Sequence, residues 1–516
     1  MTMIESNDKK TNTEQINTPP FFWLACIVIL TIARYHLGGY PGMQLSIHQS
    51  IVDSILAGND WGRQALVGNL DNPFLPTVAL LAANVVCRIT GGNPGLLLCA
   101  VSQAVVMTLF LRLAVMRRQW ILAPLLLVLS VLIPFLRNLL LSLDPNWSSA
   151  VPAAAAIFYL VRWEELDTLR DLLLVAVCIG LFAFAGPGAI IIGFCTIPLL
   201  AEQYRLKKQG SWQEHRGIRT ILWAPLLYCI AIWLLWNSLI FNDVFFGLRD
   251  AAHRMSVKIL QPKTSFDCVV FLPMIITLVI LSLKGDRRQT AKCLLPACIV
   301  IPLVSYISAR YGIGPAALGP LAYILVLSTV TLCFISSAPS RNVRFAWYAA
   351  TACTVVIACF FGTVASKYEI SEDPDKKQEE TFKPGEIADA PNAQEIIDFI
   401  DQYWPNSRVI LVGSRLPALY PDPEAKRFVS KLNFSEQDFL AQAENEQMHL
   451  LIPPPDGRFY PIQNSVLSDI YKNGRDWLFL EKVFPNDWQL WRSTVPPKGE
   501  SKIMREKTDN QPIIDK

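Results

Sequence analysis

Apolar runs alternate with short polar stretches from Phe21 to about Ser366. Each run is roughly 20 residues long, which is enough for a helix to cross a hydrocarbon core of about 30 Å. Hydropathy alone marks twelve segments, near residues 21–36, 74–90, 95–112, 120–142, 147–161, 171–185, 187–203, 220–240, 267–283, 292–309, 315–336 and 344–366. The pattern predicts a polytopic α-helical membrane protein.

Basic residues test how many of these segments cross, because Lys and Arg concentrate in cytoplasmic loops. The clusters are Arg112/Arg117/Arg118, Arg162/Arg170, Arg205/Lys207/Lys208/Arg216/Arg219, Lys284/Arg287/Arg288/Lys292 and Arg341/Arg344. From the second cluster onward, two crossings separate neighbouring clusters, so they share one side. With a cytoplasmic amino terminus, all clusters lie inside only if segment 74–90 does not cross. We therefore predict eleven crossings, with 74–90 as an interfacial or membrane-dipping helix.

The same topology divides the chain into five parts. They are a cytoplasmic polar tail (1–20), a transmembrane domain (21–366) with an external first loop (37–94), a linker (367–390), an external or periplasmic α/β domain (391–496) and a disordered tail (497–516). The linker is charged and punctuated by proline, which is typical of a segment that does not fold alone. In the domain after it, AQEIIDFIDQYW (393–404) has helical periodicity, whereas SRVILVG (407–413) and MHLLIPP (448–454) resemble strands.

Composition agrees with a membrane protein and narrows the function. Of 516 residues, 52% are hydrophobic and 17% are charged, against about 25% charged residues in a typical soluble domain. The net charge of +3 gives no indication of nucleic-acid binding. The 12 cysteines form no CxxC spacing and are interpreted as small packing residues. No HExxH, GxSxG or phosphate-loop motif supports a hydrolase or an NTPase. We expect a multi-pass protein of a bacterial inner membrane.

The external first loop begins with an amphipathic segment, MQLSIHQSIVDSILA (43–57). Its apolar residues fall mostly on one helical stripe, made of Leu45, Ile47, Ile51, Val52, Ile55 and Leu56. Such a helix suits the outer leaflet of a membrane. Gln44 and His48 lie on this helix, and a lone histidine such as His48 is more often a surface or core residue than a ligand.

Several short stretches resemble motifs of one enzyme superfamily. They are ILAGNDW (55–61), GN (68–69), LDNPFLP (70–76), WNSLIFNDVFFGLR (236–249) and ARYGIGPAALGP (309–320). Their order resembles that of the C-type glycosyltransferases, which include the bacterial aminoarabinose transferases of lipid A and the protein O-mannosyltransferases. The resemblance covers roughly residues 21–335. It implies a large external first loop, a polyprenyl-phosphate sugar as the donor and sugar transfer on the external face.

The sequence departs from this superfamily at the acid expected in the first loop. The resemblance places that acid near Met43 and Gln44, and a glutamine cannot act as a general base. Asp71, Asp144 or Asp60 takes this duty, or the chain is not a standard catalyst of the superfamily. A divalent metal such as Mg²⁺ or Mn²⁺ is a further expectation, because a carboxylate can act through a bound metal.

The three candidate carboxylates each have a structural alternative. Asp71 is the first choice as catalytic base, because nearby prolines fix its backbone, but it could instead cap the following helix. Asp144 lies in the outer turn SLDPNW and could likewise be a cap. Asp60 precedes Trp61, and the structural interpretation is favoured there.

The departing phosphate needs cations, and Arg suits this task because its planar fork forms paired hydrogen bonds with phosphate. Arg249, His253 and Arg254 could share one helix face in the external stretch 241–266, although anionic lipids are an alternative ligand. Arg310, followed by Tyr311, ends an apolar run and could instead extend to the interface. Arg137 lies inside the fourth run, so it is predicted to face the protein interior.

These features favour a membrane glycosyltransferase that moves a sugar from a polyprenyl-phosphate donor to a lipid, glycan or protein acceptor. The missing acid at Gln44 leaves open a non-catalytic, lipid-binding or assembly subunit in surface polysaccharide biogenesis. A transporter ranks third, because no internal repeat is visible. The expected partners are the lipid-linked donor, membrane lipids and an unknown acceptor, and no nucleic acid.

Overall fold

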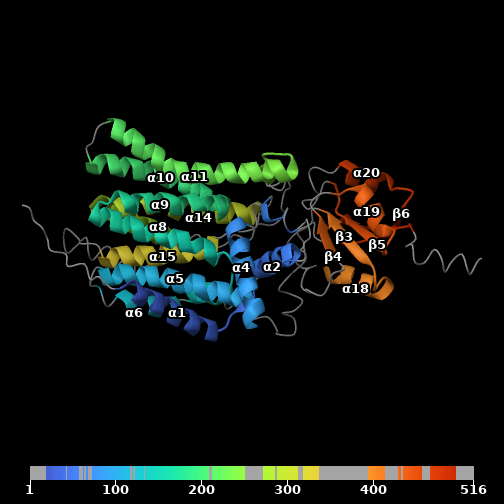
Figure 1. Ribbon diagram of the computed structural model, residues 1–516, viewed down its shortest axis with the longest axis horizontal. Helices are drawn as coiled ribbons and strands as arrows, with labels where there is room; N and C mark the ends of the chain where they lie inside the picture. Colours follow the sequence, from blue (N-terminus) through green and yellow to red (C-terminus); the bar gives the residue numbers. More distant parts are fainter. Residues whose placement is uncertain are drawn as a thin grey trace, which may run out of the picture.

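The computed structural model describes residues 19–41, 43–56, 62, 65–67, 73–116, 119, 122–132, 134–208, 212–249, 271–284, 288–311, 318–335, 393–412, 428–431, 434–455 and 465–495. Long helices lie side by side in a bundle, and a small β-sheet with its own helices lies beyond one end of it (Figure 1). That end also carries helices α2 (Met43–Leu56) and α4 (Phe74–Thr90). It is called the outer end below.

Every predicted apolar segment up to residue 336 contains a helix. The bundle consists of α1 (Pro20–His36), α5 (Pro94–Met116), α6 (Leu122–Leu132), α7 (Pro134–Leu141), α8 (Trp147–Leu166), α9 (Leu169–Gly180), η1 (Leu181–Phe184), α10 (Pro187–Lys208), α11 (Trp212–Phe241), α13 (Phe271–Lys284), α14 (Arg288–Tyr311) and α15 (Leu318–Ile335). Segment 344–366 lies outside the described residues. Among those described, three helices are long and apolar enough to span a membrane, within α5, α10 and α11. The count of eleven crossings stays a prediction.

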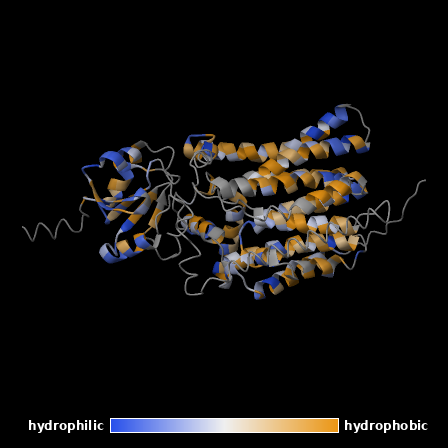
Figure 2. Cartoon of the chain, turned by 180° about the vertical axis from the view of Figure 1, so that it is seen from behind, coloured by the Kyte–Doolittle hydropathy of each residue, from blue (hydrophilic) through white to orange (hydrophobic). Residues whose placement is uncertain are grey.

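The bundle has an apolar interior and an apolar exterior. Small side chains bring neighbouring helices close, as at Gly180 of α9, where an added Cβ would lie 2.8 Å from the Cβ of Pro225 in α11. Large apolar side chains also point outward, and Phe21 and Leu239 are both 71% exposed. Figure 2 shows hydrophobic residues along the bundle helices. An exterior of this kind is expected where lipid rather than water surrounds the helices.

Helix α4 runs across the long axes of the bundle helices at the outer end (Figure 1). Its Leu80 and Ala83 pack with Val52 of α2 and Leu98 of α5 in a separate apolar cluster. The helix ends at Gly91, whose φ of +75° suits glycine. Part of the α2 stripe therefore faces α4 rather than an outer leaflet, since Ile51 and Val52 are buried. This arrangement agrees with a helix 74–90 that does not cross, and the topology itself stays a prediction.

The opposite end of the bundle, called the basic end, joins several of the predicted basic clusters. Lys207 of α10 donates hydrogen bonds to the carbonyls of Trp163 and Glu164 in α8, each over 3.2 Å, and forms an ion pair with Asp167. Arg162 lies 3.2 Å from Asp171 at the start of α9. These contacts bring clusters from different loops together, as expected for clusters that share one side of a membrane.

We expect Glu164→Ala to destabilise this end. The Glu164 carboxylate accepts hydrogen bonds from the backbone N–H of Gln289 and Thr290 and from the Thr290 hydroxyl, so it caps the start of α14. Loss of a helix cap costs about 1–2 kcal/mol of unfolding free energy. Unfolding of the purified protein in detergent measures the effect. Gln213→Ala, an exposed change on α11, is the control, and equal midpoints for the two variants would contradict the prediction.

Within the fourth apolar segment the structure describes α6 and α7, which lie on either side of residue 133, and α7 begins at Pro134. Arg137 lies on the short helix α7, close to the outer end, and its side chain is exposed. The prediction that Arg137 faces the protein interior is therefore wrong. Arg137 lies four residues before the carboxyl end of α7, which ends at Leu141, and an exposed guanidinium there needs no buried partner.

The carboxyl-terminal region forms a mixed five-stranded sheet with the order β4-β3-β5-β7-β6. Its elements are α18 (Ala393–Tyr403), β3 (Arg408–Val412), β4 (Phe428–Lys431), α19 (Glu436–Ala443), β5 (Met448–Ile452), α20 (Ser465–Asn473), β6 (Leu478–Val483), η5 (Pro485–Asp487) and β7 (Gln489–Ser493). Strands β3, β4 and β5 are parallel, whereas β7 pairs antiparallel with β5 and β6. All five residues of the central strand β5 are buried, and four of them are apolar, as expected for a strand covered on both faces.

Candidate functional site

A two-residue parallel ladder joins the start of the first loop to the turn that contains Asp144. Strand β1 (Tyr40–Pro41) pairs with β2 (Ser142–Leu143), with Tyr40 opposite Ser142 and Pro41 opposite Leu143. Because the strands are parallel, both chains leave the ladder in the same direction. One leads into the first turn of α2, which contains Gln44, and the other leads directly to Asp144. The Gln44 side chain lies outside the described part of the chain.

Arg34 holds this ladder in place. Its side chain is 5% exposed, and its Nε donates to Oε1 of Gln103 in α5 over 2.6 Å. Its Nη2 donates to the carbonyl of Leu140 over 2.7 Å, and its Nη1 donates to the carbonyl of Gly38. One guanidinium therefore ties the end of α1 to α5 and to the residues just before β2. The sequence signal was a single Arg two residues before the end of the first apolar run.

Asp144 occupies a turn at the start of α8. Its Oδ1 accepts a hydrogen bond from the backbone N–H of Asn146 over 2.9 Å, and its carbonyl accepts one from Trp147 over 3.1 Å. The Asp144 side chain therefore closes a turn before α8, and the N-cap residue of that helix is Asn146. Only one carboxylate oxygen takes part in that bond. Burial raises the pKa of Asp144 to about 6, against the lowering effect of the Asn146 N–H. Such a carboxylate exchanges protons close to neutral pH.

Two polar side chains beside Asp144 lack partners among the described residues. Asn146 is 1% exposed, and neither polar atom of its amide meets hydrogen-bond geometry there, although the amide is close enough to Asp144 to lower the pKa of that carboxyl. Oγ of Ser149, which is fully buried, also has no hydrogen bond there. A buried polar group without a partner costs about 1–3 kcal/mol, so such groups often mark a functional position. Sequence reasoning missed both residues, although they follow Asp144 in the motif DPNWSS.

His48 connects α2 to α4. Its Nδ1 lies 2.7 Å from Oγ1 of Thr77 in the first turn of α4, and the side chain is fully buried. Burial lowers the pKa of His48 to about 3, so the ring is neutral at physiological pH. Nearby, the Gln49 and Asn84 side chains form hydrogen bonds with each other. His48 thus packs between helices, in line with the structural interpretation of a lone histidine.

Contacts between the first loop and α11 fix Val67 and Phe74 at the same end of the bundle. The indole N–H of Trp233 donates to the carbonyl of Val67 over 3.1 Å. The ring of Phe74 lies 5.0 Å from that of Trp236 and 5.4 Å from that of Phe184. Val67 and Phe74 flank Asp71 in the sequence. Asp71 itself lies outside the described residues, as does Asp60.

Among the predicted phosphate ligands, the structure describes Arg249 most fully. Its Nη1 lies 3.1 Å from the Asp243 carboxylate, and its side chain is 65% exposed. Asp243 also accepts a hydrogen bond from the backbone N–H of Phe245 over 3.0 Å, which fixes the turn after α11.

The other four predicted positions can be placed only in part or not at all. His253 and Arg254 lie outside the described residues. Arg310 and Tyr311 form the last turn of α14, and their side chains lie outside the described part.

A metal centre is not formed by the described residues alone. Within the described ranges, no group of three or more His, Cys, Asp or Glu residues could hold a metal ion. Asp144 is thus a single carboxylate there, beside the amide of Asn146. The expectation of Mg²⁺ or Mn²⁺ stays a prediction.

Comparison with known proteins yields structural neighbours. No protein-family model matches the chain, and no curated protein matches it. The crystal structure of ArnT from Cupriavidus metallidurans bound to undecaprenyl phosphate is similar at 11% sequence identity and a TM-score of 0.45, over 92% of this chain and 98% of that chain. The apo structure of the same protein is similar at 12% identity and a TM-score of 0.40, over the same shares. The resemblance to the aminoarabinose-transferase branch is confirmed as a resemblance, and it assigns no residue a role.

Proposed function

We propose that the chain transfers a sugar from a polyprenyl-phosphate donor to a lipid, glycan or protein acceptor at the outer end of the bundle. The β1–β2 ladder is the observation that carries this proposal. It brings Asp144 beside the first turn of α2, where the superfamily resemblance expects an acid and the sequence has Gln44. A carboxylate from a different segment thus takes the place of the missing one.

Asp144 is the proton acceptor in this proposal. The acceptor hydroxyl gives its proton to the Asp144 carboxylate while its oxygen attacks the anomeric carbon of the sugar. The bond between that carbon and the phosphate oxygen breaks, and the polyprenyl phosphate leaves. The carboxylate oxygen that is not bound to Asn146 is suited to this step. Asn146 and Ser149 have unused polar atoms within the described part that can orient the acceptor or the sugar.

Arg249 supports the leaving phosphate. Asp243 binds one nitrogen of its guanidinium, so the remaining N–H groups can donate to phosphate oxygens. The predicted phosphate ligands also include Arg254, His253, Arg310 and Tyr311. Asp71 and Asp60 stay predictions as further carboxylates. The proposed donor class agrees with the undecaprenyl phosphate bound in the ArnT structure.

The arrangement in the membrane completes the proposal. The outer end faces the periplasm, and the basic end faces the cytoplasm with the tail 1–20. The transmembrane domain spans 21–366, the linker spans 367–390, and the sheet domain within 391–496 is periplasmic and covers the acceptor side. The sheet lies beyond the outer end in Figure 1, which supports that role.

The pH dependence of donor turnover tests the proposal. We expect turnover to rise about tenfold per pH unit below pH 6 and to level off above it, because only ionised Asp144 accepts a proton and burial raises its pKa to about 6. A usual aspartate would give a profile already flat from about pH 4. The measurement is mass-spectrometric detection of polyprenyl phosphate released from a panel of polyprenyl-phosphate pentoses and hexoses in membranes.

Two outcomes would contradict this function. A profile with no inflection between pH 5 and 7 removes Asp144 as the base. Purified protein that consumes no donor and retains a partner chain supports the non-catalytic assembly subunit, for which the glutamine at position 44 is the observation in favour.

A further inference from the structure

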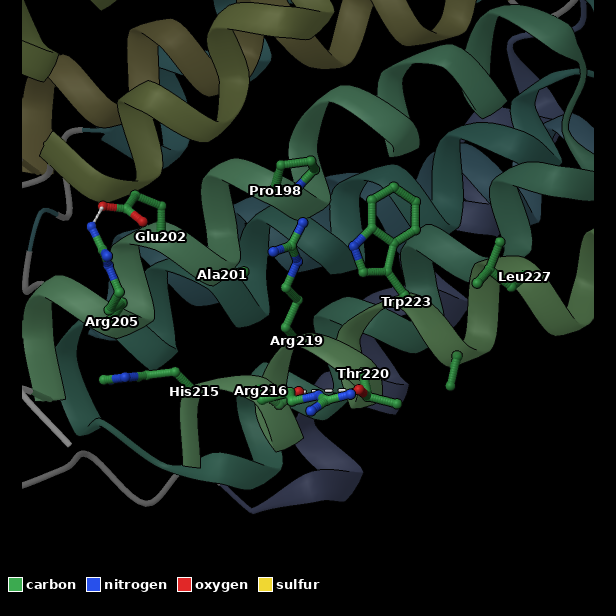
Figure 3. Close-up of a pocket in the computed structure, with 11 residues that line it drawn as sticks. Pro198, Ala201, Glu202, Arg205, His215, Arg216, Arg219, Thr220, Trp223 and Leu227 are labelled. Atoms are coloured by element: carbon green, nitrogen blue, oxygen red, sulfur yellow. Dashed lines mark hydrogen bonds and ion pairs between the residues drawn. The ribbon is translucent and has the colours of Figure 1, made fainter. Parts of the chain in front are cut away.

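A groove of about 1210 Å³ lies between α10 and α11 (Figure 3). It is at the basic end of the bundle, whereas Asp144 lies at the outer end. It is lined by Pro198, Ala201, Glu202, Arg205, His215, Arg216, Arg219, Thr220, Trp223, Ala224 and Leu227. The first half of α11 and the second half of α10 form its walls. The mechanism proposed above uses none of these residues.

Among the residues that line the groove, basic side chains outnumber acidic ones. It holds three arginines, and Glu202 is the acid among its lining residues. That carboxylate is already paired with Arg205 over 2.6 Å. No ion pair within the described residues involves Arg219, whose side chain points between Pro198 and Trp223 (Figure 3). The lining residues therefore carry an excess of positive charge, on arginine side chains that are exposed.

The frame around these arginines is fixed by contacts with neighbouring helices. Tyr204 of α10 donates a hydrogen bond to Glu214 of α11 over 3.2 Å, and its ring stacks on that of Trp163. Lys207 anchors the same end of α10 to α8. The arginines thus lie on two helices whose separation is fixed by these contacts with each other and with α8. A fixed separation lowers the entropy cost of binding an anion.

The other half of the groove is apolar and continues onto the exterior of the bundle. Trp223 packs against Phe194 with ring centroids 5.3 Å apart, and Phe194 is 41% exposed. Leu227 lies one turn further along α11 and is 50% exposed. A free phosphate would use the arginines alone, whereas a lipid phosphate would place its chains along Trp223 and Leu227.

We propose that this groove binds an anionic phospholipid, with the phosphate against Arg216 and Arg219 and an acyl chain along Trp223 and Leu227. Charge complementarity and the continuous path from the arginines to the exposed apolar surface select this occupant. Tryptophan suits the position between headgroup and acyl chain, because its ring is apolar and its N–H is polar. The site is independent of sugar transfer at the outer end.

Native mass spectrometry of the full-length protein with added dioleoyl phosphatidylglycerol tests the proposal. We expect the double variant R216Q/R219Q to lose affinity for this lipid about tenfold, and R216K/R219K to keep most of it. The control R88Q/R137Q removes the same charge from exposed positions at the outer end and should bind like the unmodified protein. Zwitterionic dioleoyl phosphatidylcholine should bind at least tenfold more weakly.

Each contrary result has a definite meaning. Equal phosphatidylglycerol binding by R216Q/R219Q and R88Q/R137Q overturns the site. If glycerol phosphate displaces phosphatidylglycerol at an equal phosphate concentration, the acyl chain does not contribute to binding. The groove is then a site for a phosphate headgroup, and the assignment to a phospholipid is wrong. Stronger binding of undecaprenyl phosphate than of phosphatidylglycerol overturns the phospholipid as occupant. Because the readout is lipid binding, these outcomes do not depend on donor turnover.

Discussion

Asp144→Asn should lower donor turnover by about 10²- to 10⁴-fold, the usual contribution of a general base. The substitution separates the two roles of this side chain. An asparagine oxygen can still accept the hydrogen bond from the backbone N–H of Asn146, so the turn before α8 should persist. The amide cannot take a proton from an acceptor hydroxyl. The loss should therefore appear in turnover and not in expression or unfolding.

Asp53→Asn is the matched control for this substitution. Asp53 is also a carboxylate at the outer end, and its Oδ1 accepts a hydrogen bond from Gln49 over 2.9 Å. Its replacement removes the same charge and should leave turnover within twofold. Equal turnover by the two variants, measured as polyprenyl phosphate released per folded protein, would mean that Asp144 is only a cap and would return attention to Asp71.

Arg34→Met is expected to destabilise the protein by about 2–3 kcal/mol. The change leaves the Gly38 carbonyl and Oε1 of Gln103 without their donor, whereas the Leu140 carbonyl keeps its bond from Gln103 Nε2. Each buried acceptor that loses a partner costs about 1–3 kcal/mol. Relief from burying a guanidinium offsets part of this cost. Methionine keeps the length and the apolar stem of the side chain.

Unfolding in detergent with increasing denaturant measures this effect. Arg137→Met is the control, because that arginine is exposed on α7 at the same end, and surface changes usually stay within about 0.5 kcal/mol. Turnover by the folded fraction of Arg34→Met should also fall, since the guanidinium holds the residues just before Asp144. Unchanged unfolding of Arg34→Met would contradict the role assigned to its hydrogen bonds.

The helices of the bundle were predictable because hydrocarbon imposes one strong requirement, an apolar run long enough to cross it. The first helix was expected at 21–36 and spans Pro20–His36. The helix expected at 147–161 extends to Leu166. Hydropathy does not reveal this last turn, because it carries the charged Glu164, which caps α14 rather than facing lipid.

The site was less predictable than the fold. Strands of two residues show no alternation of apolar and polar positions, so nothing local indicates that Pro41 lies opposite Leu143. The roles of Arg34 and Asn146 depend on which acceptors tertiary packing brings near them, and spacing along the chain does not encode this. Asp144 was recognised as a candidate from its turn, but its proximity to the start of α2 required the ladder.

The β1–β2 ladder also sets an order of events during synthesis. Its partners are about 100 positions apart in the chain, so Tyr40 and Pro41 emerge from the ribosome long before Ser142. Helices α5 and α6 must be inserted before the partner strand is available. Nascent chains that end before residue 143 should therefore leave the first loop open to proteases, and longer chains should protect it.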